Sequence, residues 1–362
     1  MARTYYPLHL KAMEKEKVWG GHDLERLLGK QLSPATHIGE TWEAWEGCAI
    51  ENGDCAGRSL QSLIEEDAAG ILGPANDKRF PLLFKFIDAQ DDLSVQVHPD
   101  DARAQAMERQ PFGKTEAWYI LKAEPDARLI FGLKETAGAK EIAAAIERKN
   151  LVELLSSVSV KRGDVVFVPA GTIHAIGKGI VLAEIQENSD ITYRLYDWDR
   201  KGKGRELHID QSLKVFAGLR IEHPKIPPVV LHHGRFDESF LVACRYFALT
   251  LCEIDGRADG LTTHGKFQIL SVIDGATEIR YGPKLESSVE ARQGQTLVLP
   301  AGLGEYAVES IRPVKMLRMF VPDLRADVIA PLLQAGYDAK TIVRLGGGIP
   351  DQNDLAPLVK EM

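Results

Sequence analysis

Two stretches of this 362-residue chain share one pattern, in which a polar lead-in and an aliphatic strand end in Pro-Ala-Gly. The first stretch covers residues 164–171 (DVVFVPAG), and the second covers residues 294–302 (GQTLVLPAG), about 130 residues further on. A Pro-Ala-Gly corner favours a tight turn that returns the chain as a second strand. The repeat therefore predicts a mainly β protein built from two β-barrels.

The two copies differ in the residues that follow the corner. His174 begins the return strand of the first copy, whereas the second copy, aligned without gaps, has Glu305 at that place. A Gln-x-His sequence, Gln96 to His98, precedes the first copy, and no such sequence precedes the second. We therefore expect one metal-bearing barrel and one structural barrel.

The strand around Gln96 has a period of two. In residues 93–98 (LSVQVH), aliphatic residues alternate with polar ones, so one face of the strand is apolar. The other face then presents the amide of Gln96 beside the imidazole of His98, as two neighbouring ligands of one metal ion would lie. The alternative interpretation is an edge strand with a solvated polar face.

Composition limits the classes of partner. The formal net charge of −8 and the pI of about 5.8 argue against a general nucleic-acid binder. No apolar run is long enough to cross a bilayer, and the first 21 residues lack the pattern of a secretory signal. The four cysteines form no Cys-x-x-Cys pair. We expect a reduced, cytoplasmic protein with no nucleic-acid or membrane partner.

Helical patterns interrupt the strands. Ser59 can cap a helix over residues 60–72, and Asp100 or Asp101 can cap a helix that follows Pro99. Residues 139–157 have helical spacing and predict a helical insertion.

A lysine, Lys85, interrupts the apolar run 82–87 (LLFKFI), which predicts a buried strand. A charge in such a place either snorkels outward or serves a site, and snorkelling is the commoner outcome.

Several motifs, in order along the chain, resemble type I mannose-6-phosphate isomerase in its short bacterial form. They are QVHPDD, GKTEAWYIL, VPAGTIHAI, and ENSDITYRLYDWDR followed by KGKGRELHID, with WGG and IGETWE nearer the N-terminus. The resemblance extends from about residue 5 to about residue 325. It implies a zinc-dependent enzyme of two cupin-type (jelly-roll) barrels that interconverts mannose 6-phosphate and fructose 6-phosphate.

Functional residues follow from the resemblance by motif position. It implies one Zn²⁺ per chain, held by Gln96, His98, Glu116 and His174. It places an active-site arginine on Arg194 and an active-site lysine on Lys114. The group that transfers protons between the two carbons stays open. Basic residues Lys201, Lys203 and Arg205 have a weaker claim to the substrate phosphate.

The motifs also suggest a division of the chain. We expect a catalytic domain over residues 1–225, a second, metal-free barrel over 226–325, and a tail over 326–362. The tail lies beyond the recognised motifs and reads as one or two short helices around Gly346–Gly348. We expect this tail to be a docking segment or an oligomer contact. We expect the protein to be a monomer or a homodimer.

Two other functions are compatible with these residues. Two histidines and a carboxylate also form the facial triad of iron-dependent cupin oxygenases, although a glutamine ligand and nearby basic residues count against this class. A non-catalytic sugar-phosphate sensor that has kept the barrel but lost turnover is the second alternative.

Overall fold

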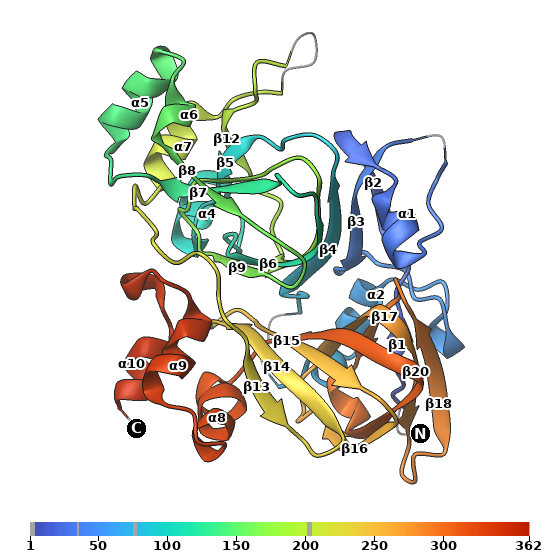
Figure 1. Cartoon of the computed structure of the whole chain (residues 1–362). Coiled ribbons are helices and arrows are strands. Elements are labelled where there is room, and N and C mark those ends of the chain that lie inside the picture. Colours follow the sequence, from blue (N-terminus) through green and yellow to red (C-terminus); the bar gives the residue numbers. More distant parts are fainter. Residues whose placement is uncertain (1–3, 35, 75–77, 201–204, 362) are drawn as a thin grey trace.

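The computed structural model describes residues 4–34, 36–74, 78–200 and 205–361. Its strands form three sheets, and the paired strands within them run antiparallel (Figure 1). Two of the sheets belong to the N-terminal part of the chain, and the third contains the C-terminal strands. The prediction of a mainly β protein is confirmed.

Two sheets of the N-terminal part pack face to face. The six-stranded sheet has the order β2 (Met13–Gly21), β3 (Ile38–Ala44), β4 (Leu82–Ala89), β11 (Ile180–Glu187), β6 (Glu116–Ala123) and β9 (Val165–Val168). The five-stranded sheet has the order β12 (Tyr193–Tyr196), β5 (Val95–Val97), β10 (His174–Ile176), β7 (Arg128–Leu133) and β8 (Leu155–Ser159). Apolar side chains of both sheets, such as Trp118 and Leu182 from one and Phe131 from the other, form one buried cluster between them.

The third sheet has nine strands. They are β1 (Leu8–His9), β19 (Thr296–Leu299), β17 (Gln268–Tyr281), β20 (Glu305–Phe320), β15 (Ala248–Ile254), β14 (Phe236–Ala243) and β13 (Val229–His232), with β16 (Arg257–Thr262) paired to β20 and β18 (Ser287–Arg292) paired to β17. Its interior is apolar and includes Val272, Val308 and Met316. Because β1 pairs with β19, the beginning of the chain joins the C-terminal sheet.

None of the three sheets closes on itself in the part of the chain that the structure describes. The two closed barrels are therefore not confirmed and stay a prediction. One large apolar cluster joins the N-terminal and C-terminal sheets, with Phe84 and Phe167 on one side and Phe247 and Leu317 on the other. The two parts thus share a core.

Short helices and 3₁₀ turns connect the strands that precede β20. They are α1 (Asp23–Leu28), α2 (Leu60–Glu66), α3 (Ala68–Leu72), α4 (Asp101–Glu108), α5 (Ala139–Glu147), α6 (Leu151–Leu154) and α7 (Ile209–Val215), with the 3₁₀ turns η1 (Gly53–Cys55) and, after β19, η2 (Ala301–Leu303). Of these, α3 packs against η2 beside the C-terminal sheet. Ser59 and Asp100 cap α2 and α4 as predicted, each accepting a backbone N–H. The helix expected over residues 60–72 breaks at Asp67, whose carboxylate caps α3.

The helical insertion expected over residues 139–157 ends earlier than predicted. Leu155 leaves the helical conformation and begins β8, which pairs with β7. Sheet pairing at this edge therefore overrides the helical spacing of the last three residues.

The tail is helical, as predicted, but it has more segments than expected. They are the π-helix η3 (Leu324–Ile329), α8 (Ala330–Gln334), α9 (Ala339–Val343), the 3₁₀ turns η4 (Arg344–Gly346) and η5 (Pro350–Gln352), and α10 (Leu355–Lys360). The tail packs against the chain's own core rather than extending away from it (Figure 1). Among the described residues, no helix has the length and apolar character needed to span a membrane.

Candidate metal centre

The candidate site lies between the two N-terminal sheets, where strands β12, β5 and β10 are neighbours. His174 of β10 is paired with Gln96 of β5, and Gln96 is also paired with Arg194 of β12. Directly opposed residues of antiparallel strands share a face, so these three side chains form one row across the sheet. Val95 and Val97 belong to an apolar cluster on the other face. The predicted alternation is confirmed for residues 95–97, whereas Leu93 precedes β5 and packs in the cluster between the two sheets.

Three side chains from the two facing sheets converge on one point. His98 follows β5 directly, and Glu116 begins β6 in the other sheet. His174 Nε2 lies 3.2 Å from Glu116 Oε1, and His98 Nε2 lies 3.7 Å from Glu116 Oε2. Ligand atoms of the three residues lie within 4.8 Å of one another, and the described residues contain no other such group of His, Cys, Asp and Glu. The amide of Gln96 reaches the same point, with Nε2 3.3 Å from His174 Nε2.

Backbone carbonyl groups hold both imidazole rings. His98 Nδ1 lies 2.7 Å from the carbonyl oxygen of Ile191, and His174 Nδ1 lies 2.9 Å from that of Thr172. Since a carbonyl oxygen only accepts, each Nδ1 carries the proton and each Nε2 presents its lone pair to the cluster. Histidines that bind metal are commonly held in this way.

Burial sets the protonation of these groups. The side chains of His98, Glu116 and His174 are at most 1% exposed. Burial, with the charge of Lys114 adding to it, lowers the pKa of His98 well below its usual range and that of His174 to about 3. Burial raises the pKa of Glu116 to about 7. Both imidazoles are therefore neutral at pH 7, which is the form that binds a metal.

Two cationic side chains flank the cluster. Lys114 is buried, contacts the carboxylate of Glu116, and has its Nζ 3.1 Å from His98 Nε2. Arg194 is half-buried, and its Nε has no hydrogen-bond acceptor in the described structure. Burial lowers the pKa of Arg194, yet a guanidinium stays charged at neutral pH. Of the six residues implied by the resemblance, the structure thus brings five side chains together and places Arg194 on the neighbouring strand, paired with Gln96.

A second buried ion network lies beside Glu116. Lys85 of β4 is paired with Glu184 of β11, and its Nζ lies 3.3 Å from Glu184 Oε1 and 4.0 Å from Glu40 Oε2. Trp118 Nε1 donates a hydrogen bond of 2.8 Å to Glu184. Although burial acts to raise it, the pKa of Glu184 is lowered because Lys114 and Lys85 stabilise its charged form.

Of the two outcomes considered for Lys85, snorkelling is excluded, since the residue is 3% exposed and its ammonium is held between two carboxylates. Sequence reasoning assigned no role to Glu184. The signal was present in residues 182–186 (LAEIQ), where polar side chains alternate with apolar ones in a strand buried on both faces.

The structure adds no support for the expectation that Lys201, Lys203 and Arg205 bind the substrate phosphate. Lys201 and Lys203 lie outside the described residues. Arg205 forms a two-point ion pair with Asp197, with Nη2 2.6 Å from Oδ1 and Nε 3.2 Å from Oδ2. Arg205 is therefore held by a carboxylate of the chain, which it shares with Arg200, whose Nη1 lies 2.9 Å from Asp197 Oδ1.

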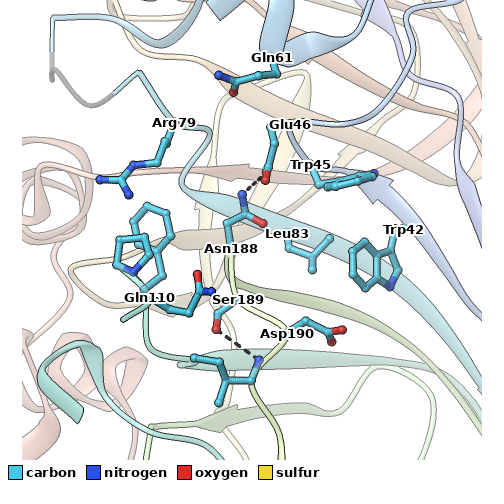
Figure 2. Close-up of a pocket in the computed structure, with 13 residues that line it drawn as sticks. Trp42, Trp45, Glu46, Gln61, Arg79, Leu83, Gln110, Asn188, Ser189 and Asp190 are labelled. Atoms are coloured by element: carbon cyan, nitrogen blue, oxygen red, sulfur yellow. Dashed lines mark hydrogen bonds between the residues drawn. The ribbon is translucent and has the colours of Figure 1, made fainter. Parts of the chain in front are cut away.

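The structure has a cavity of about 690 Å³ (Figure 2), whose walls include neighbours of the metal cluster but none of its three side chains. Its wall includes Ile191, whose carbonyl oxygen holds His98, and Trp42, whose indole donates to Glu40 in the second ion network. Trp42 and Trp45 form one side of the cavity, and Asn188 lies between them and the opposite wall. This volume is in the usual range for a site that binds a small molecule.

The donor set fits a resident metal ion. Two neutral imidazoles, one carboxylate and one amide form a mixed nitrogen and oxygen set. Glu116 Oε1 is buried without a hydrogen-bond donor in the described structure, which leaves it open to a cation. The fold and the cluster define a cupin-type protein with a buried candidate metal centre.

Comparisons with known proteins agree with this class. The family model for the phosphomannose isomerase type I catalytic domain matches residues 8–123, and that for the mannose-6-phosphate isomerase cupin domain matches residues 237–319. The chain is 40% identical to mannose-6-phosphate isomerase ManA of Bacillus subtilis over 84% of this chain and 96% of that protein. It is 37% identical to the mannose-6-phosphate isomerase of Streptococcus mutans over 81% and 92%. The chain belongs to the type I mannose-6-phosphate isomerase family.

A solved structure supports the same conclusion. The crystal structure of mannose 6-phosphate isomerase from Bacillus subtilis matches with a TM-score of 0.79 at 31% sequence identity. The match covers 86% of this chain and 99% of that chain. The solved phosphomannose isomerase of Salmonella typhimurium, at 17% identity and a TM-score of 0.73, shares the fold.

Proposed function

We propose that this protein is an enzyme that interconverts D-mannose 6-phosphate and D-fructose 6-phosphate. The observation that carries the proposal is the buried group of His98, Glu116 and His174 with Lys114 against it. A cavity of about 690 Å³ lies nearby, and its wall includes Ile191, whose carbonyl oxygen holds His98. The curated relatives that cover most of the chain bear the name of this activity.

We assign one Zn²⁺ per chain to this group, with Gln96, His98, Glu116 and His174 as ligands. The neutral imidazoles and the carboxylate are the donors that zinc prefers, and the amide oxygen of Gln96 adds a fourth. A bound zinc ion would supply a Lewis acid beside the substrate carbonyl. Burial of the three charged or ionisable ligands keeps water away from them.

Isomerisation moves a hydrogen between C1 and C2 through an enediolate, which is more negative than the starting carbonyl compound. Arg194 and Lys114 place fixed positive charge where this negative charge develops. Because the site is partly buried, such charges act at a lower dielectric than in water. They stabilise the enediolate more than the neutral carbonyl, which lowers the barrier. The arginine cannot act as the base at neutral pH.

The cavity walls suit a sugar. Trp42 and Trp45 offer aromatic faces, while Glu46, Asn188 and Asp190 offer hydrogen-bonding groups on the same cavity. Glu46 and Asn188 are hydrogen-bonded to each other, so their positions are fixed before a ligand enters. We expect a hexose phosphate to enter here and to place its reacting carbons at the metal cluster.

The division of the chain follows from the same proposal. Residues 1–225 form the metal-bearing cupin domain, residues 226–325 form a second cupin unit without a metal, and residues 326–362 form a helical tail. The pairing of β1 with β19 moves the first strand into the second unit. We further propose a cytoplasmic monomer or homodimer whose partner is the sugar phosphate.

A coupled isomerase assay tests the proposal. Protein stripped with a strong chelator should lose activity, and added Zn²⁺ should restore it. Full turnover by protein shown to be metal-free would overturn the metal-dependent mechanism. A zinc-loaded protein that binds mannose 6-phosphate without turning it over would instead be a sensor, and iron with oxygenase activity would indicate the remaining alternative.

A further inference from the structure

The tail extends beyond the family match and is nevertheless firmly packed. The second family model ends at residue 319, so the tail lies outside it. Ile342, Leu345 and Leu355 are completely buried and belong to the large apolar cluster shared by the two parts of the chain. The tail is therefore part of the folded core, and its contacts with the N-terminal sheets can influence the site.

One asparagine holds the middle of the tail as a rigid loop. Asn353 is 7% exposed, and its Nδ2 donates to the carbonyl oxygens of Val343 (2.8 Å) and Gly347 (2.9 Å). Its Oδ1 accepts from the backbone N–H groups of Leu355 and Ala356, each at 3.0 Å. The side chain thus uses its full hydrogen-bonding capacity, which fixes residues between α9 and α10 relative to one another.

This loop, residues 347–352, lies against the strand and turn that lead to His174. A Cβ atom on Gly347 would lie 2.6 Å from Cδ1 of Phe167 in β9, so a larger residue at this position would clash with the phenylalanine ring. Ile349 is 6% exposed and lines a narrow crevice of about 10 Å³ with Gly171, Thr172 and Ile173.

A hydrogen bond makes the third contact. Gln352 Nε2 donates to the carbonyl oxygen of Ala170, at 3.4 Å. The three contacts therefore follow residues 167–173 from the end of β9 through the Pro-Ala-Gly corner.

The supported turn fixes two of the metal-site histidines through its backbone. The N–H of Gly171 donates to the carbonyl oxygen of His98 at 2.8 Å. The carbonyl oxygen of Thr172 accepts from His174 Nδ1 at 2.9 Å and so orients that ring. A shift of this turn would therefore move both imidazoles relative to Glu116.

We propose that the loop 347–352 is a positioning element for the metal centre. It presses on the outer side of the turn 169–172, and the inner side of that turn holds His98 and His174. The loop contributes no ligand of its own. Its contribution is to keep the two histidines in the geometry that binds the metal, as outer groups do in other metal sites. The proposal rests on the metal centre and remains testable by metal binding without any assay of isomerase activity.

The test is metal binding by the full-length protein with Ile349→Ala and Gln352→Ala combined. Affinity is measured by competition between the apoprotein and a chromogenic zinc chelator. We expect the double variant to bind Zn²⁺ about tenfold more weakly, the lower end of the effect of removing an outer group. Activity at saturating zinc should return to near the wild-type value, because the substituted residues do not touch the substrate cavity.

Tyr337→Phe is the matched control. Like Gln352→Ala, it removes one hydrogen bond from a tail side chain to a backbone carbonyl group. The Tyr337 hydroxyl donates to the carbonyl oxygen of Val230 at 2.6 Å, and Val230 lies in β13 of the C-terminal sheet, away from the turn before His174. We expect its zinc affinity to equal that of the wild type. Urea unfolding of each apoprotein establishes that all three are folded during the titration.

Two results would overturn the proposal. One is a wild-type zinc affinity in the double variant, and the other is an equal loss in Tyr337→Phe. A second double variant carries Ile349→Val in place of Ile349→Ala, which keeps most of the side chain. Its zinc affinity should recover in part if packing on the turn is the cause. A wild-type protein that binds zinc through this cluster but has no isomerase activity would refute the proposed function and leave the positioning proposal standing.

Discussion

The two Pro-Ala-Gly corners of this chain have the same residues and different consequences. After the first corner, His174 begins β10 completely buried and faces Glu116 across the interior. After the second corner, a 3₁₀ turn intervenes and Glu305 begins β20 exposed to solvent. The corner therefore specifies a turn between strands, while the direction of the next side chain depends on the conformation of the turn, since both turns have the same number of residues.

The buried regions next to the two corners also differ in the kinds of side chain that fill them. Ionisable side chains such as Lys85, Glu116 and Glu184 occupy the interior next to the first corner. The interior next to the second is filled by apolar side chains, including Leu270 and Val308. The second part also has a buried ion pair, Arg318 with Glu238, but among the described residues only the first part brings two histidines and a carboxylate together.

The largest expected effect separates His174 from Glu305. His174→Ala removes one ligand and should weaken zinc binding by more than about 100-fold, beyond the usual effect of losing an outer group. Glu305→Ala changes an exposed side chain and should leave zinc binding unchanged. Zinc content after dialysis, measured by atomic absorption, checks both. Normal zinc content in His174→Ala would show that the ion is bound elsewhere.

Two arginines, one in each part, should differ in the property that they support. Arg194→Ala should reduce kcat by about two to three powers of ten with normal zinc content, because a fixed positive charge beside the enediolate is lost. Arg194→Lys should recover only part of this loss, since the charge stays but the planar fork does not. Steady-state kinetics on zinc-loaded protein measure the effect.

Arg318 is the matched arginine of the second part. It is ion-paired with the buried Glu238, so Arg318→Ala should destabilise the fold by about 3–5 kcal/mol and leave the kcat of the folded fraction near normal.

One result would contradict the prediction for Arg194. An Arg194→Ala protein with a raised KM and an unchanged kcat would show that Arg194 holds the substrate phosphate and does not stabilise the enediolate.

A pH effect should come from the first part. Burial, reinforced by Asp101, raises the pKa of Glu187 to about 9 from its ordinary value of 4.5. The folded state therefore favours the protonated carboxyl group, and its stabilising contribution is complete below pH 4.5 and is lost as the pH rises toward 9. Unfolding free energy should fall by up to about 1.4 kcal/mol per pH unit in this window.

Substitution of the carboxyl groups separates the two parts again. Glu187→Gln should flatten the decline in stability between pH 5 and pH 9, as followed by urea unfolding. Glu238 has a lowered pKa because, against the effect of burial, Arg318 favours its charged form. Glu238→Gln should therefore change the unfolding free energy by a constant amount above pH 4.5. The decline of that free energy between pH 5 and pH 9 should keep its slope.

The smallest effects concern two glycines, Gly171 in the first corner and Gly304, which follows the second corner by two residues. Gly171 and Gly304 both have positive φ, +84° and +77°, so alanine at either is strained by about 1–2 kcal/mol. A Cβ atom on Gly171 would also lie 3.0 Å from the carbonyl oxygen of Val215. A Cβ atom on Gly304 would have no neighbouring atom within 4 Å in the described structure. Gly171→Ala should therefore lower the melting temperature more than Gly304→Ala. Equal shifts would show that backbone strain alone decides.

Sequence alone determined the β class and two helix caps, and the family resemblance predicted the residues of the site. The period of two in residues 93–98 was sufficient to place Gln96 and His98 on one face, because alternation is a local property of an extended chain. Ser59 and Asp100 were recognised as caps for the same reason, since a cap bonds to a backbone group only three residues away.

Only the tertiary structure decided which side chains meet. Lys85 read as a snorkelling lysine because its partners Glu184 and Glu40 lie on other strands, at separations that no local pattern reveals. Residues 155–157 read as helix because the sheet edge that recruits them is formed by β7. The tail likewise had no assigned neighbour until Ile349 and Gln352 were found against the turn before His174. Local sequence fixes the direction of a side chain, but long-range packing fixes what it touches.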